Sequence, residues 1–232
     1  MTEVKKHHTR RYRSPARGVF RSAAHLLLLK PLLWTVLRIH VHGRQNLKSL
    51  RNNQAFIVIA NHSSHFDAPL IAGALPRRLS GRLAAAAAAD YFFKKWYKML
   101  PTRAFFNVFP VDRDGSKTYK GLTGQLLNEK VPILIMPEGS RSRSGTLGDF
   151  KPGTAALSIK HQVPVLPIAL IGAHEAWPPG AKIWRPGRPT VHVNFGQPLM
   201  PKPDESVEQF NQRLRDTVVK LYNKFIPKKG EK

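Results

Sequence analysis

Apolar runs alternate with more polar, helix-like stretches along the chain after Gly43. Runs that are rich in β-branched and aromatic residues, and bounded by Gly, Pro, Asn or Asp, predict buried strands. We expect strands at residues 55–60, 83–89, 107–111, 131–136, 163–171 and 190–195. The spacing of apolar residues predicts helices at residues 69–75, 91–100, 117–127, 154–160 and 206–225. This alternation predicts an α/β fold, with a mostly parallel central sheet flanked by helices.

The second predicted strand is unusual because six of its residues are alanine. Helix propensity favours a helix for such a run. Its short length and its position between two predicted helices favour a strand, and we assign it as a strand. Small side chains there would let a neighbouring element pack closely.

The segment from Val19 to Val41 is apolar with charged edges, and Lys30 and Pro31 interrupt it. Its uninterrupted apolar stretch is far shorter than the ~20 residues that a membrane-spanning helix needs. It predicts one or two short amphipathic helices that lie on a bilayer surface. A helix packed on the protein's own core is the alternative.

Positive charge dominates the composition, with 38 Lys and Arg against 14 Asp and Glu and a formal net charge of +24. Such an excess implies an anionic partner, either a nucleic acid or an anionic membrane. It is densest within residues 1–18, a polar stretch in which we expect little order. Cysteine is absent, which excludes disulfides and a Cys nucleophile. We divide the chain into residues 1–45, a basic tail with docking helices, and residues 46–232, one domain.

Polar residues gather where the first predicted strand ends: Asn61, His62, Ser64 and Asp67. A strand-to-helix turn would bring His62 and Asp67 together, with His62 as a base and Asp67 fixing its tautomer. Ligand sites in open α/β sheets lie at the carboxyl ends of strands, where this stretch is found. Ordinary turn and helix-cap residues are the alternative interpretation.

Two further polar groups follow later strands, Arg113 after the third and Glu138, Gly139, Ser140 and Arg141 after the fourth. Guanidinium groups bind phosphate through paired hydrogen bonds, and a glycine lets the backbone approach it closely. These residues predict a phosphate site at the same rim, whereas surface ion pairs and a flexible basic loop are the alternatives. We predict no metal site, because the histidines of the first group lack a third ligand.

These groups, in this order, resemble the sequence blocks of the glycerophospholipid acyltransferase family, of the 1-acylglycerol-3-phosphate acyltransferase kind. The four blocks correspond to Asn61-His62-Ser63-Ser64-His65-Phe66-Asp67, to a second block ending in Arg113, to Met136-Pro137-Glu138-Gly139-Ser140-Arg141, and to Val163-Pro164-Val165-Leu166-Pro167-Ile168. Ser140 replaces the family's usual Thr, Met136 its Phe, and Asn107 a frequent Gly. None of these changes removes a catalytic group, but they leave the choice of acceptor open.

The resemblance implies transfer of a fatty acyl group to the sn-2 hydroxyl of 1-acylglycerol-3-phosphate, which makes phosphatidic acid. The donor would be a substrate, acyl-CoA or acyl carrier protein, and no cofactor is implied. His62 and Asp67 would be catalytic, Asn61 and Ser64 supporting, and the substrate-binding residues would be Arg113, Glu138, Gly139, Ser140 and Arg141. A lyso-ornithine lipid, a glycolipid or glycerol-3-phosphate is the alternative acceptor.

The compact size of the chain and the lack of a predicted spanning helix indicate a peripheral enzyme on the cytoplasmic face of the cell membrane. The partner of the positive charge would then be an anionic membrane surface. A nucleic-acid partner is not expected, because no helix-turn-helix, zinc-finger or RNP-type signature accompanies the charge.

Overall fold

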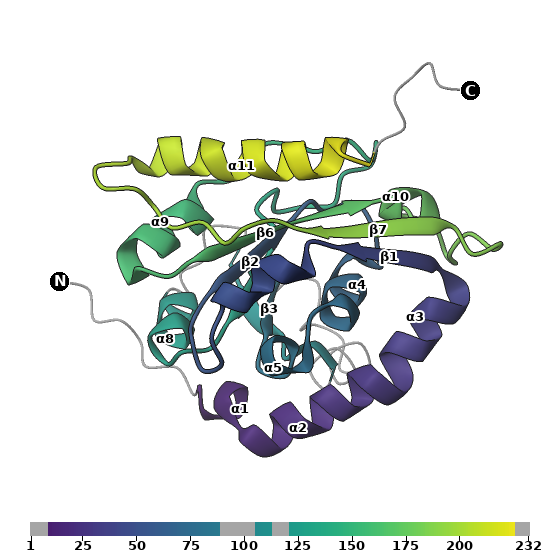
Figure 1. Ribbon diagram of the computed structural model, residues 1–232, viewed down its shortest axis with the longest axis horizontal. Helices are drawn as coiled ribbons and strands as arrows, with labels where there is room; N and C mark the ends of the chain where they lie inside the picture. Colours follow the sequence, from purple (N-terminus) through teal and green to yellow (C-terminus); the bar gives the residue numbers. More distant parts are fainter. Residues whose placement is uncertain (1–8, 89–104, 113–120, 226–232) are drawn as a thin grey trace.

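The computed structural model describes residues 9–88, 105–112 and 121–225 (Figure 1). Its strands are β1 (Arg38–His42), β2 (Ile57–Ala60), β3 (Ala84–Ala88), β4 (Phe109–Val111), β5 (Ile133–Ile135), β6 (Val165–Ile171) and β7 (Thr190–Phe195). Its α-helices are α1 (Arg10–Arg13), α2 (Pro15–Ala24), α3 (Lys30–Val36), α4 (Asp67–Ala74), α5 (Arg77–Ser80), α8 (Leu122–Asn128), α9 (Gly153–His161), α10 (Ala173–Ala176) and α11 (Val207–Asn223). A π-turn, His25–Leu29, and a 3₁₀ helix, Arg44–Ser49, complete the elements.

The described strands form one sheet in the order β1-β7-β6-β2-β5-β3-β4. Strands β6, β2, β5, β3 and β4 run parallel to one another. Strand β7 pairs antiparallel with β6, and β1 pairs parallel with β7, so these two strands run in the opposite direction. The predicted α/β fold with a mostly parallel sheet is confirmed. Strands β2, β4 and β5 therefore end at the same edge of the sheet.

Two hydrophobic cores cover the two faces of the sheet. Along β2, Val58 and Ala60 pack with α4 and the N-terminal helices, whereas Ile57 and Ile59 pack with α8, α9 and α11. This alternation is the period of two that a strand imposes. Figure 1 shows α11 on one side of the sheet and α4 and α5 on the other. Both faces are thus buried, as a parallel sheet requires.

The strands expected from apolar runs are all found, and the alanine run forms β3. The expected C-terminal helix is α11, where Phe210, Leu214 and Val218 are buried on one face. Ser206 begins it with a capping box, in which its side chain and that of Gln209 bond reciprocally to the backbone. The helix expected at residues 91–100, and the first part of that at 117–127, lie outside the described residues.

The end of the N-terminal apolar segment is a strand, which corrects our expectation of a helix there. Arg38–His42 form β1, with Ile39 and Val41 packed against the core. Ile39 and Val41 are two residues apart, a spacing that fits one face of a strand rather than a continuation of the helical pattern. The sheet therefore begins before residue 46, where we had placed the domain boundary.

Residues 9–18 form helices rather than the largely unordered stretch that we expected. The side chain of Tyr12 is buried in the core and meets the ring of Phe109 edge-on, with centroids 6.4 Å apart. Ser14 caps α2 by accepting a hydrogen bond from the Arg17 N–H. The aromatic contact, the helix cap and the bonds of Thr9 and Arg13 to Glu129 hold this polar segment against the domain.

Helix α2, the π-turn and α3 form one helix of 22 residues, Pro15–Val36, longer than we expected. In the π-turn, the Lys30 N–H bonds to the carbonyl of His25, and this wider turn precedes Pro31, which has no N–H to donate. By length and composition alone, it is the one helix of the described residues that could cross a membrane. The Arg21 side chain fixes it to the domain by donating a 2.6 Å hydrogen bond to the carbonyl of Gly81. Burial, followed by the charge of Arg17, lowers the pKa of Arg21 to about 10.

Candidate active site

Asn61 extends the pairing of β2 beyond the end of the strand. Its side-chain amide donates to the carbonyl of Leu170 at 2.9 Å and accepts from the Leu170 N–H at 2.8 Å. These two bonds imitate a strand partner for β6 after β2 has ended. The following loop consequently leaves the sheet from a fixed point, which makes Asn61 a scaffold for its neighbours.

His62 and Asp67 are brought together by the turn between β2 and α4, as the sequence predicted. The Nδ1 of His62 lies 2.8 Å from Oδ2 of Asp67, whose side chain is fully buried. The backbone N–H groups of Ser63 and Ser64 donate to the same oxygen, each at 2.8 Å. Asp67 is also the first residue of α4, where the helix dipole favours a carboxylate. A proton held on Nδ1 by this carboxylate leaves Nε2 as the basic nitrogen.

Ser64 uses its hydroxyl within the loop. The hydroxyl donates to the carbonyl of Trp177 at 2.9 Å and accepts from the N–H of Phe66 at 3.1 Å. The Trp177 ring in turn packs against the ring of Phe66, with centroids 5.0 Å apart. These contacts make Ser64 part of the turn that positions the base.

Glu138 fixes the backbone around His62 through hydrogen bonds of its carboxylate. Its two carboxylate oxygens accept from the N–H of His62 at 2.7 Å and from the N–H of Gly148 at 3.0 Å. The carbonyl of His62 accepts from the N–H of Ser142 at 2.7 Å, so Glu138 and Ser142 hold the backbone of His62 on both its N–H and its carbonyl side. Burial raises the pKa of Glu138, while these two N–H donors act in the opposite direction. Both oxygens bond to the backbone of this chain rather than to an open site.

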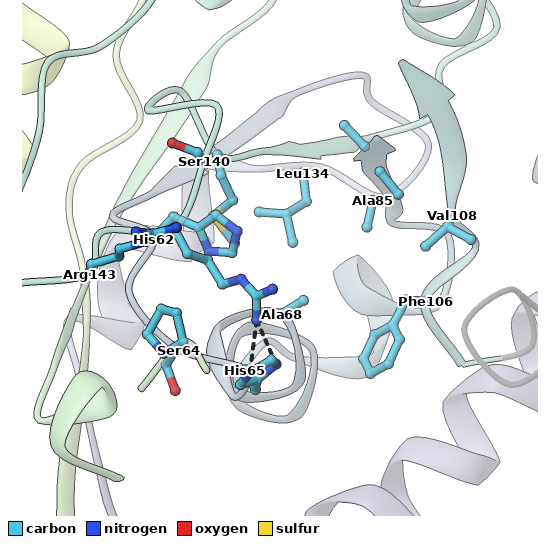
Figure 2. Close-up of a pocket in the computed structure, with 15 residues that line it drawn as sticks. His62, Ser64, His65, Ala68, Ala85, Phe106, Val108, Leu134, Ser140 and Arg143 are labelled. Atoms are coloured by element: carbon cyan, nitrogen blue, oxygen red, sulfur yellow. Dashed lines mark hydrogen bonds between the residues drawn. The ribbon is translucent and has the colours of Figure 1, made fainter. Parts of the chain in front are cut away.

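Arg141 lies against His65. One terminal nitrogen of its guanidinium is 2.6 Å from Nδ1 and 3.0 Å from Nε2 of His65 (Figure 2). Burial, and then the charge of Arg141, lower the pKa of His65. The His65 ring also meets the ring of Trp177, with centroids 4.9 Å apart. These contacts hold the guanidinium beside the turn that carries His62.

Arg113 lies outside the described residues, so its expected place at the rim stays a prediction. The residue before it, Asp112, follows β4 and lines a cavity that also contains His62. The described part of the chain therefore brings the first and third sequence blocks together, and it brings Asp112 to the same cavity as His62.

His62 borders a cavity of about 490 Å³. Figure 2 shows His62 and Ser140 on one side of it and Phe106 and Val108 on the opposite side. Apolar side chains form most of its wall, namely Ala68, Ala85, Ala86, Ala87, Phe106, Val108, Leu134, Met136 and Pro179. Arg141 and Arg143 also line it. A long apolar chain with a polar end suits this combination.

A smaller cavity, of about 320 Å³, also borders His62. It contains Gly139, whose positive φ of +76° suits glycine, together with residues from β4, α8 and α9. Our sequence reading missed two residues that line it, Lys151 and Thr154, because we took them only as the start of a helix. A lysine followed by Pro152 and a helix start is too common a pattern to mark a site.

Comparisons with known proteins agree with this architecture. The protein named 1-acyl-sn-glycerol-3-phosphate acyltransferase from Cocos nucifera is 26% identical over 224 residues, which cover 87% of this chain and 69% of that protein. A protein of the same name from Limnanthes douglasii is 29% identical over 158 residues, 66% of this chain, and the match spans only 52% of that protein.

A solved structure and a family model extend the comparison. The crystal structure of the 1-acyl-sn-glycerophosphate acyltransferase PlsC from Thermotoga maritima has the same fold, with a TM-score of 0.65 and 24% identity over 93% of this chain and 80% of that one. The family model described as Acyltransferase matches residues 38–171, from β1 to the end of β6. Because this match spans more than half of the chain, the chain belongs to the Acyltransferase family.

Proposed function

We propose that the protein transfers a fatty acyl group from an acyl thioester to the sn-2 hydroxyl of 1-acylglycerol-3-phosphate, producing phosphatidic acid. The observation that carries this proposal is the His62–Asp67 pair, held where two cavities meet. The names of the relatives from Cocos nucifera and Limnanthes douglasii support the choice of acceptor. The donor is a substrate, acyl-CoA or acyl carrier protein, and no cofactor takes part.

His62 acts as the general base in this mechanism. Its Nε2 removes the hydroxyl proton of the acceptor as the oxygen attacks the thioester carbonyl carbon. Asp67 stabilises the imidazolium that forms, through the bond to Nδ1. The tetrahedral intermediate then collapses, the carbon–sulfur bond breaks, and the leaving thiolate takes the proton from the imidazolium.

The acyl group passes directly between the substrates, without an acyl-enzyme. The chain has no cysteine, and the hydroxyl of Ser64 already bonds to the carbonyl of Trp177. The larger cavity, with its wall of alanine, phenylalanine, valine and leucine side chains, accepts the apolar chain. Arg141 and Arg143 attract the anionic carrier of the acyl donor to its polar end.

The test is acyl transfer by the purified protein from a long-chain acyl-CoA to lysophosphatidic acid, with phosphatidic acid as the measured product. The same assay with acyl carrier protein as carrier identifies the donor. A lyso-ornithine lipid and glycerol-3-phosphate in place of lysophosphatidic acid test the acceptor. Faster transfer to either of these than to lysophosphatidic acid would contradict the proposal.

Glu138 should position the base rather than bind substrate. We expect Glu138→Gln to lower kcat about tenfold, since an amide has a single acceptor oxygen and one of the two N–H donors loses its partner. The KM for the acceptor should stay nearly unchanged. Steady-state kinetics for both substrates provide the measurement. A rise in the acceptor KM at full kcat would show instead that the carboxylate contacts the acceptor.

An apolar helix at the N-terminus and relatives that act on lipids support membrane association. We infer that the helix Pro15–Val36 lies on the cytoplasmic face as a peripheral anchor. Lys30 interrupts its apolar length, and the buried Arg21 keeps one face on the domain. The opposite face exposes Val19, Phe20, Leu26, Leu27, Leu28 and Leu32 to between 43% and 68%.

Introducing charge on this exposed face should detach the protein from membranes. We expect the double change Leu27→Glu and Leu28→Glu to lower partitioning onto vesicles of anionic phosphatidylglycerol by about 100-fold, because each leucine loses its apolar contact with the lipid. Vesicle flotation measures the bound fraction. Met200→Glu, at another exposed apolar position, is the matched control. Unchanged flotation of the double variant would exclude this face as the anchor, and retention of the wild type in alkaline carbonate would indicate a spanning helix instead.

A further inference from the structure

His62 lies between two cavities, and both combine apolar with polar lining residues. The two cavities share His62, Ala86, Ala87 and Met136 in their walls. The larger continues along apolar side chains of β3, β5 and the segment before β4, which suits a hydrocarbon chain. The smaller continues towards the first turns of α8 and α9. A substrate group in the smaller cavity would thus approach His62 without entering the larger cavity.

Among the described residues that line the smaller cavity, Lys151 is the one lysine or arginine. A Cβ atom on Gly139 would lie only 2.9 Å from its Nζ, so the lysine side chain passes directly over this glycine. The backbone is fixed there, because the Lys151 N–H donates to the carbonyl of Pro137 at 2.9 Å. Across residues 9–88, 105–112 and 121–225, the ammonium group has no hydrogen-bond or ion-pair partner. Lys151 is exposed, and its ammonium is an unpaired positive charge on the wall of the smaller cavity.

Thr154 adds a second unpaired donor to this cavity. Its side chain is only 3% exposed and lines the cavity, and its hydroxyl has no hydrogen-bond partner within the described part of the chain. Helix α9 begins beside it at Gly153, and no side chain caps this helix. Its first N–H groups consequently remain available to an anion. An ammonium, a buried hydroxyl and free N–H groups form a donor set suited to phosphate oxygens.

We propose that Lys151, with Thr154 and the first turn of α9, binds the phosphate monoester of the acceptor. This inference rests on the proposed function. In 1-acylglycerol-3-phosphate, only two carbons and one ester oxygen separate the reacting hydroxyl oxygen from phosphorus, so the phosphate must bind close to the base. The smaller cavity meets this condition, since His62 and Lys151 both line it. Arg141, engaged with His65, lines the larger cavity instead.

The kinetic experiment compares Lys151→Gln with Lys151→Arg and with Lys160→Gln, an exposed lysine at the far end of α9. We expect Lys151→Gln to raise the KM for lysophosphatidic acid about 10- to 100-fold, the loss typical of one charge-assisted bond. Lys151→Arg should recover most of this loss. The KM for acyl-CoA should not change in any variant. A larger effect on the acyl-CoA KM, or an equal effect of Lys160→Gln, would overturn the assignment to the acceptor phosphate.

Direct binding separates this inference from the proposed function. Titration of the ¹⁵N-labelled protein with sn-glycerol 3-phosphate should shift the backbone amides of Gly153 and Thr154, with affinity lost at least tenfold in Lys151→Gln and kept in Lys160→Gln. If lysophosphatidic acid is not acylated but this binding is found, the phosphate subsite stands and the proposed function fails. Absence of these shifts in the wild type, or equal affinity in Lys151→Gln, overturns the subsite whatever the activity.

Discussion

Replacing His62 with alanine should lower kcat for acyl transfer by about 10²–10⁴-fold, the contribution of a positioned general base. The acceptor hydroxyl is a weak nucleophile at neutral pH, and the described structure offers Nε2 of His62, held by Asp67, to take its proton. The KM values should change little, because the substitution removes a group that acts in the transition state. Initial rates with saturating acyl-CoA and lysophosphatidic acid provide the measurement.

The fold should survive this substitution. The side chain of His62 is 22% exposed and faces two cavities, so its loss leaves the hydrophobic cores intact. The backbone bonds of His62 to Glu138 and Ser142 do not depend on the imidazole. Circular dichroism and thermal unfolding of the variant serve as the control. A folded variant that kept the wild-type rate would remove His62 from the mechanism.

Changing Asp67 to asparagine should lower kcat about 100-fold or more while the turn keeps its shape. The amide oxygen can accept the three bonds now made to Oδ2, from Ser63, Ser64 and His62. The amide nitrogen would take the place of Oδ1, which is buried and has no partner within the described residues. The substitution therefore removes mainly the negative charge that stabilises the imidazolium.

The same variant should also lose stability, by about 1–3 kcal/mol, because it leaves a buried amide N–H unpaired and weakens three charge-assisted bonds. Urea unfolding monitors this loss beside the kinetics. Asp216→Asn on the exposed face of α11 is the matched control and should change neither property. If Asp67→Asn unfolded more readily yet kept full kcat, the carboxylate would have a structural role alone.

Local sequence was sufficient to predict the elements that carry the base. Strand β2, the turn after it and the start of α4 each have a local sequence signal. These signals are the apolar run, the polar residues that follow it, and Pro69. The spacing of His62 and Asp67 excluded a shared helical face, so only a turn could join them, and the structure has that turn. The mostly parallel order followed from the alternation of strands and helices.

Contacts between distant segments could not be predicted in the same way. The smaller cavity combines residues of β4, α8 and α9, and only folding brings Lys151 to His62. The N-terminal segment misled us for a related reason, because Tyr12 becomes ordered through its contact with Phe109, almost one hundred positions away in the sequence. The sequence left open whether Glu138 positions backbone or the glycerol of the acceptor, because its two bonds to the N–H groups of His62 and Gly148 depend on the folded chain.

The alanines of β3 have a consequence for the evolution of this enzyme. Ala85, Ala86 and Ala87 line the larger cavity, so a strand of minimal side chains forms part of its wall. Valine or isoleucine at such positions would suit a strand better than alanine does, since β-branched residues have the higher strand propensity. Each replacement would also fill part of the chamber. Natural drift along this strand could thus shorten the preferred acyl chain step by step, without touching the base.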